Sequence, residues 1–215
     1  MWKVYRRMAM VGGLAALAAA TGMAAAPAQA QLRSQLGAGL PPVSLGGPCL
    51  RSGQAYLRAH IRGAVRLDVD LRGPQLSCEG GPRFDGSGIR MAFEGRVGER
   101  RVRMVFGIDG AREGRPGREL PTNLTVIFEG EQQLFATQGD GNCTVDRLRQ
   151  ERIVAAKGDR IPSSRAASET RSYRIVAHGF CIAPANDLSG KRRILVTTFD
   201  FAGRADFEHA PQRRN

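Results

Sequence analysis

The sequence predicts an all-β protein, folded as an antiparallel β-sandwich or barrel in a single domain with two disulfides. Three observations support this fold class. Apolar and polar residues alternate along several segments, as they do in strands with one buried face. Turns rich in Gly and Pro separate these segments, and no segment after residue 30 has a convincing 3.6-residue helical period. Four cysteines, an even number, follow a segment that resembles an export signal.

Residues 1–30 have the three-part pattern of a secretory signal peptide. A basic stretch precedes small apolar residues, and Ala28-Gln29-Ala30 supplies the A-x-A cleavage site. Cleavage there would leave a chain that begins at Gln31 and would lower the formal net charge from +12 to +9, because three basic residues are removed. Arg6-Arg7 leaves a twin-arginine signal open as an alternative. The predicted location is periplasmic or extracellular, in a bacterium.

The chain is expected to have four regions: a signal peptide at 1–30, a Gly/Pro-rich linker at 31–48, an all-β domain at 49–208 and a flexible tail at 209–215. No apolar run after residue 30 approaches the roughly 18 residues of a membrane-spanning helix. We therefore expect no transmembrane segment in the mature chain.

The first predicted β-hairpin turns at Gly63. On both sides of this glycine the apolar residues occupy odd positions, and a three-residue loop would pair Ile61 with Val65 and keep them on one face. Arg58 would then lie opposite Asp68 as a cross-strand ion pair. A single long strand bent at the same glycine is the alternative.

The second predicted hairpin turns at Gly98-Glu99. Glycine at the first of the two central positions suits a type II′ turn. This turn pairs Phe93 with Met104 in the core and places Glu94 opposite Arg103 on the solvent side.

The remaining chain is expected to contain strands at 123–129, 133–137, 143–147, 172–182 and 192–202, a polar loop at 110–122, a turn at 139–142, a short helical turn at 147–153 and a long surface loop at 155–170.

The cysteines are expected to form disulfides because an exported chain matures in an oxidising compartment. The first hairpin would bring Cys49 near Cys78, and elimination then pairs Cys143 with Cys181. No C-x₂-C or H-x₃-H spacing is present, so we expect no zinc or other metal site.

No catalytic motif is evident, so an enzyme is the less favoured reading and no cofactor is expected. G-x-S-x-G, Walker and H-E-x-x-H patterns are all absent. Asp68, Asp70 and Asp200 are the carboxylates that a hydrolase would use. His178 lies between apolar Val176 and Phe180, which predicts a hydrogen-bonded interior imidazole.

The functional prediction is based on the positive charge of the chain. The candidate residues for an anionic ligand are Arg100, Arg101, Arg103, Arg58 and Arg62; further arginines cluster at 112–118, 147–152 and 192–193. A basic surface attracts polyanions, which predicts a non-enzymatic binding protein for an anionic lipid or polysaccharide of the cell envelope, or for an envelope protein. Specific nucleic-acid binding is not expected because the phenylalanines fall mainly on the apolar phase of the strands. The alternatives are a carboxylate-dependent secreted hydrolase and a structural or inhibitory envelope module.

Overall fold

The structure, a computed structural model, describes residues 49–50, 54–154 and 169–209. These all belong to the compact unit formed by Ser44–Asn215. The predicted signal peptide at 1–30, nearly all of the linker at 31–48, most of the loop at 155–170 and the tail beyond His209 lie outside the described residues.

The described chain is almost entirely β-structure. Its strands are β1 (Tyr56–Gly63), β2 (Leu67–Arg72), β3 (Leu76–Pro82), β4 (Gly88–Val97), β5 (Arg100–Asp109), β6 (Leu120–Glu129), β7 (Gln133–Ala136), β8 (Cys143–Ile153), β9 (Glu169–Cys181), β10 (Ala185–Asp187) and β11 (Arg193–His209). Two single 3₁₀ turns, η1 (Gly73–Gln75) and η2 (Asp140–Asn142), complete the order. In the part of the chain that is described, no helix has the length and apolarity needed to cross a membrane.

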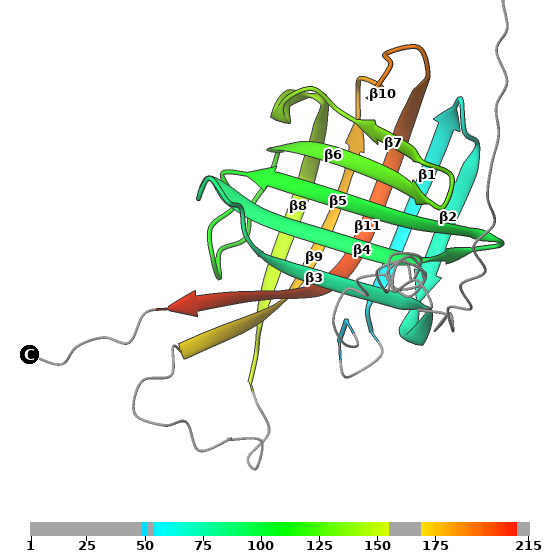
Figure 1. The fold of residues 1–215 in the computed structure, drawn as a ribbon. Coiled ribbons are helices and arrows are strands. Elements are labelled where there is room, and N and C mark those ends of the chain that lie inside the picture. Colours follow the sequence, from blue (N-terminus) through cyan, green and yellow to red (C-terminus); the bar gives the residue numbers. More distant parts are fainter. Residues whose placement is uncertain (1–48, 51–53, 155–168, 210–215) are drawn as a thin grey trace, which may run out of the picture. The chain divides into compact units, whose positions relative to one another are not determined.

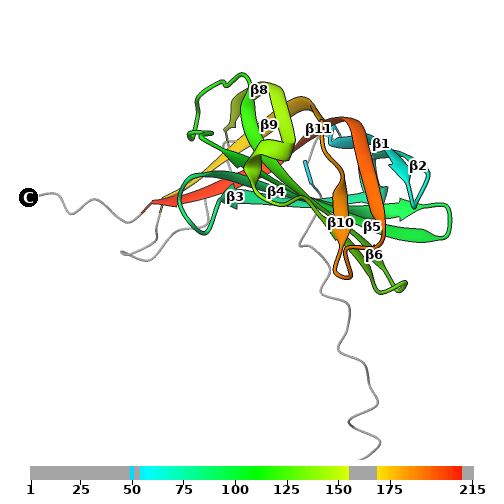
Figure 2. The same ribbon diagram turned by 90° about the horizontal axis from the view of Figure 1, so that it is seen from above.

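All eleven strands belong to one antiparallel sheet. Its main path runs β2-β1-β11-β10-β7-β6-β5-β4-β3, while β8 pairs with β6 and β9, and β9 pairs with β11. The sheet folds over into two layers: β3 to β7 cross in front of β1, β2, β8, β9 and β11, and β10 joins the layers at one side (Figures 1 and 2). The predicted antiparallel all-β class is confirmed.

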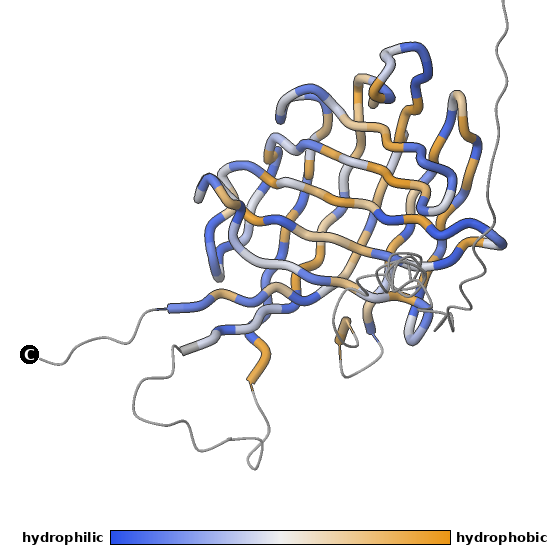
Figure 3. Tube along the Cα trace, viewed as in Figure 1, coloured by the Kyte–Doolittle hydropathy of each residue, from blue (hydrophilic) through white to orange (hydrophobic). Residues whose placement is uncertain are grey.

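The core lies between these two layers. Apolar and polar residues alternate along the strands (Figure 3), so each strand turns one side chain in two toward the other layer. Phe93 and Phe106 from the front layer meet Phe201 from β11 with ring centroids 4.8 Å apart in both pairs. All three side chains are fully buried, and an added Cβ at Gly203 would come within 2.8 Å of the Phe93 ring. The absence of a side chain there lets the layers approach closely.

The first hairpin forms, but its register differs from the predicted one by two residues. Ile61 pairs with Leu67 and Arg58 with Asp70, so the expected Arg58–Asp68 pair was wrong. The reason is β11 on the other side of β1: it pairs as far as Gly63, where an added Cβ would come within 2.6 Å of a backbone oxygen. The chain can turn only after this pairing ends. A shift of two residues keeps the apolar face buried.

The second hairpin has the predicted register, with Phe93 opposite Met104 and Glu94 opposite Arg103. Gly98 has a φ of 61°, as the first central position of a type II′ turn requires. The expected exposed Glu94–Arg103 ion pair was wrong. The Glu94 side chain is only 10% exposed and its nearest guanidinium, 3.9 Å away, belongs to Arg101.

Further local predictions need correction. Residues 147–153 continue strand β8 rather than forming a helical turn, and β11 continues to His209 instead of ending at residue 202. Strands β3 and β10 were not anticipated. His178 is 55% exposed and not interior, because the inward residues of β9 occupy the odd positions while Val176 and Phe180 share its outward side.

Both predicted disulfides are present. Cys49 is bonded to Cys78, and Cys143 is bonded to Cys181. The second bond joins residues that lie directly opposite each other in β8 and β9, at the end of their ladder.

Candidate functional site

The five arginines predicted to bind an anion each lie beside a carboxylate of the protein itself. The nearest atoms are Arg58 Nε and Asp70 Oδ1 at 3.6 Å, Arg62 Nη1 and Asp68 Oδ1 at 2.7 Å, Arg100 Nε and Glu131 Oε1 at 3.1 Å, Arg101 Nη1 and Glu129 Oε2 at 3.6 Å, and Arg103 Nη2 and Glu79 Oε1 at 3.4 Å. The first two arginines belong to β1 and the other three to β5, which lie in different layers of the sheet. The structure therefore does not bring the five together.

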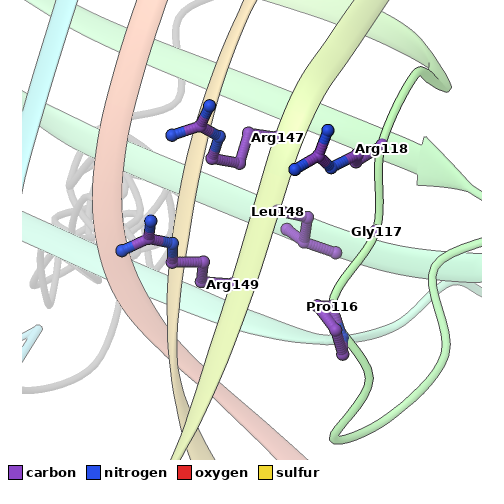
Figure 4. A pocket seen from close by; sticks show the side chains of 6 residues that line it. All are labelled: Pro116, Gly117, Arg118, Arg147, Leu148 and Arg149. Carbon is purple, nitrogen blue, oxygen red and sulfur yellow. The ribbon is translucent and has the colours of Figure 1, made fainter.

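A different set of arginines surrounds an open hollow of about 470 Å³. Its lining consists of Pro116, Gly117, Arg118, Arg147, Leu148 and Arg149, and we call it the arginine hollow. Arg147 and Arg149 project to the same side of β8, and Arg118 reaches toward β8 from the loop between β5 and β6 (Figure 4). The sequence had shown these arginines only as members of two separate clusters.

A β-bulge in β8 orients Arg147 and Arg149. Val145 lies opposite Gly179 but Arg147 lies opposite His178, so Asp146 is an extra residue on the bulged strand. Before the bulge the odd residues point into the core. After it Leu148 is buried, and the arginines on either side of it are exposed. Strict alternation would have pointed both guanidinium groups into the core.

The 110–119 loop is attached to β8 by backbone and side-chain hydrogen bonds. Gly117 N donates to Leu148 O over 3.1 Å, and Leu148 N donates to Gly117 O over 2.9 Å. An added Cβ at Gly117 would come within 2.6 Å of the Leu120 side chain. A larger residue at Gly117 would therefore have to displace the Leu120 side chain.

Gln150 holds the outer part of the same loop. Its Oε1 accepts a hydrogen bond from Gly114 N over 2.9 Å, and its Nε2 lies 2.7 Å from each of the carbonyl oxygens of Arg112 and Arg115. One carboxamide thus satisfies three backbone groups of the loop. Glu113 adds a second anchor, because its carboxylate accepts a hydrogen bond from the Tyr173 hydroxyl over 3.1 Å.

The arginines of the hollow have no carboxylate partner among the described residues. The nearest acid along β8, Asp146, accepts a hydrogen bond from His178 Nδ1 over 3.0 Å. No ion pair to a described residue involves Arg118, Arg147 or Arg149. Their guanidinium donors are therefore not used by a carboxylate of the described residues.

The carboxylates considered for a hydrolase have other partners. Arg62 and His60 hold the pKa of Asp68 below its ordinary value, and Arg72 does the same for the pKa of Asp70. Asp200 Oδ1 accepts a hydrogen bond from the Tyr56 hydroxyl over 2.9 Å. Burial, followed by this bond, raises the pKa of Tyr56. A general acid needs a raised carboxyl pKa, and the pKa values of Asp68 and Asp70 move in the opposite direction.

Within the described ranges, no three His, Cys, Asp or Glu side chains are grouped so that they could hold a metal ion. No family model, curated protein or solved structure matches this chain. One sequence signal could have located the arginine hollow: the change from odd to even apolar positions between Val145 and Leu148.

Proposed function

We propose that this is an exported, non-enzymatic protein that binds an anionic component of the cell envelope in the arginine hollow. The observation that carries the proposal is that Arg118, Arg147 and Arg149, without carboxylate partners in the described structure, line one open hollow. A guanidinium fork binds phosphate or carboxylate oxygens bidentately.

The fixed geometry of the hollow supports recognition rather than diffuse attraction. The backbone bonds between Gly117 and Leu148, together with the Gln150 side chain, hold Arg118 beside β8 before any ligand binds. A preorganised site loses less conformational entropy on binding. The formal net charge of +9 that remains after removal of residues 1–30 adds a long-range attraction for anions.

Export is supported by the signal-like residues 1–30 and by the two disulfides, since such bonds persist in oxidising compartments. The expected mature protein begins at Gln31. The intact mass of exported material, allowing for pyroglutamate, tests this start site. A different start or an added lipid would contradict it.

The binding experiment compares two variants that lose the same charge. R118Q/R147Q/R149Q removes the hollow's arginines, whereas R66Q/R96Q/R193Q removes three exposed arginines outside it that also have no ion pair with a described residue. Heparin and vesicles containing phosphatidylglycerol serve as probes at low and high salt. Each arginine near an anionic surface contributes about 1 kcal/mol, so the first variant should bind on the order of 100-fold more weakly at low salt. The second should lose much less.

Equal losses in the two variants would mean that binding depends on net charge and not on the hollow. If the wild type shows no salt-dependent binding to either probe, the anionic-ligand proposal fails. A structural or inhibitory module with a protein partner then becomes the leading hypothesis.

A further inference from the structure

We propose that the anionic partner of the arginine hollow is a lipid bilayer, and that Phe180 and Ile182 insert into the bilayer interface beside the bound headgroups. This inference rests on the proposed function and specifies its ligand. It is carried by exposed apolar side chains that continue the outward face of the sheet next to the arginines.

The described structure exposes a small set of large apolar side chains: Phe84, Ile153, Val154, Phe180, Ile182 and Leu188. Phe180 is 39% exposed and Ile182 is 71% exposed. Exposed apolar side chains close to a basic site are the residues that an interfacial membrane protein would insert.

Backbone pairing places these two residues next to the hollow. Phe180 lies opposite Thr144, and His178, two residues earlier on β9, lies opposite Arg147. Residues two apart on a strand share a face, so Phe180 projects from the same outward side as His178. The arginines and the phenylalanine therefore belong to neighbouring rows of one surface.

Ile182 extends this surface by one more row. Its backbone N–H donates to Asn142 O over 2.9 Å, which continues the β8–β9 ladder beyond the paired half-cystines Cys143 and Cys181. Cys181 is buried while Ile182 is exposed, so Ile182 remains on the outward side with Phe180. The disulfide fixes the backbone from which both side chains project.

The combination of charges and apolar groups favours a bilayer over a polysaccharide. A polysaccharide offers anionic groups to the arginines but no hydrocarbon for Phe180 and Ile182. An anionic leaflet offers phosphates to the arginines and acyl chains directly beneath them. The proposal therefore predicts that loss of the apolar pair affects bilayer binding alone.

The test uses F180S/I182S, with I153S/V154S as a matched control. The control pair is also apolar and exposed, but lies at the other end of β8. We expect F180S/I182S to bind vesicles of phosphatidylcholine with phosphatidylglycerol roughly tenfold more weakly and to bind heparin like the wild type. The control should match the wild type with both probes.

A fluorescent variant makes the test independent of folding losses. Trp2, the only tryptophan of the chain, lies in the predicted signal peptide, so F180W in the background of the mature chain carries a single reporter. Insertion predicts a blue-shifted emission on addition of the anionic vesicles and quenching by brominated lipids, whereas V154W in the same background should show neither.

Two results would overturn the bilayer inference. One is an unshifted F180W emission under conditions in which the arginines of the hollow are required for vesicle binding. The other is an equal loss of heparin and vesicle binding in F180S/I182S. In both cases the proposed function would survive if R118Q/R147Q/R149Q still weakens binding to heparin, and the ligand would then be a polysaccharide.

Discussion

The arginines of the β4–β5 hairpin and those of the arginine hollow are similar in sequence but differ in their surroundings. Arg100, Arg101 and Arg103 lie along β5, and β3, β6 and the turn after β6 supply a glutamate to each. Arg147 and Arg149 alternate along β8, where Asp146 is hydrogen-bonded to His178 and no described carboxylate pairs with the guanidinium groups.

The difference shows that arginine density in a sequence does not tell which arginines lack a carboxylate partner in the fold. Cross-strand neighbours decide whether a positive charge is used within the fold or remains for a ligand. In the hairpin, Glu79, Glu129 and Glu131 come from β3, β6 and the turn that follows β6. At β8 the neighbouring segment is the 110–119 loop, which contributes a further arginine, Arg118.

The largest expected effect on stability comes from a core residue of the β4–β5 hairpin. Phe93→Ala removes a fully buried ring that packs on Phe201 and Gly203, so unfolding should become easier by about 3–5 kcal/mol. Urea denaturation measures the loss. Anion affinity of the folded variant should stay unchanged, because the ring does not line the hollow.

Arg103→Gln is the matched change on the outward face of the same hairpin. It removes a partly exposed contact with Glu79 and should cost less than about 1 kcal/mol. If it costs as much as Phe93→Ala, the assigned inward and outward faces of the hairpin are wrong.

The second prediction concerns the hollow. Gln150→Leu removes three hydrogen bonds to the loop without changing the charge of the protein. At about 1 kcal/mol for each bond, stability should fall by roughly 2–3 kcal/mol. Heparin affinity should fall roughly tenfold, because only the backbone bonds between Gly117 and Leu148 then hold Arg118 beside β8.

A double-mutant cycle separates this positioning role from a general loss of structure. Adding Arg118→Gln to Gln150→Leu should weaken binding much less than Arg118→Gln does alone. Gln75→Leu, an exposed change in η1, is the control. Fully additive losses would show that Gln150 does not act through Arg118.

The sequence predicted the features that depend on local contacts better than those that depend on contacts with distant parts of the chain. Local alternation and turn chemistry were sufficient for the β4–β5 register. They were insufficient for the register at Gly63, because β11, more than 100 residues away in the chain, holds the end of β1. The pairing of the cysteines followed from the presence of the first hairpin and from elimination, and did not need the exact register of that hairpin.

The arginine hollow also depends on contacts between residues that are far apart in the sequence. It requires the bulge at Asp146 and the contact between Gly117 and Leu148, neither of which leaves a local turn signature. Arginine density alone points to the five arginines of β1 and β5, because the sequence does not show that carboxylates from other strands and turns lie beside them.

The smallest expected effect comes from the one buried acid of the hairpin. Burial, followed by the charge of Glu129, raises the pKa of Glu94 above its ordinary value of 4.5, and its Oε2 is buried without a hydrogen-bond partner. A carboxyl with a raised pKa in the folded state binds its proton more tightly there than in the unfolded chain. The contribution of Glu94 to the free energy of unfolding therefore falls as pH rises from about 4.5 through the pKa of the folded state.

Glu94→Gln keeps the shape of the side chain and removes this titration. The variant should be more stable than the wild type above that pH range, by less than about 1 kcal/mol, and the difference should shrink below it. Urea midpoints on both sides of the range measure the change. Glu151→Gln provides the control, because Glu151 is 63% exposed and paired with Arg174, so its removal should give no such gain. A loss of stability for Glu94→Gln at neutral pH would contradict this prediction. It would mean that the ionised carboxylate of Glu94 stabilises the fold through Arg101, and that this charge pair outweighs the cost of burying the carboxylate.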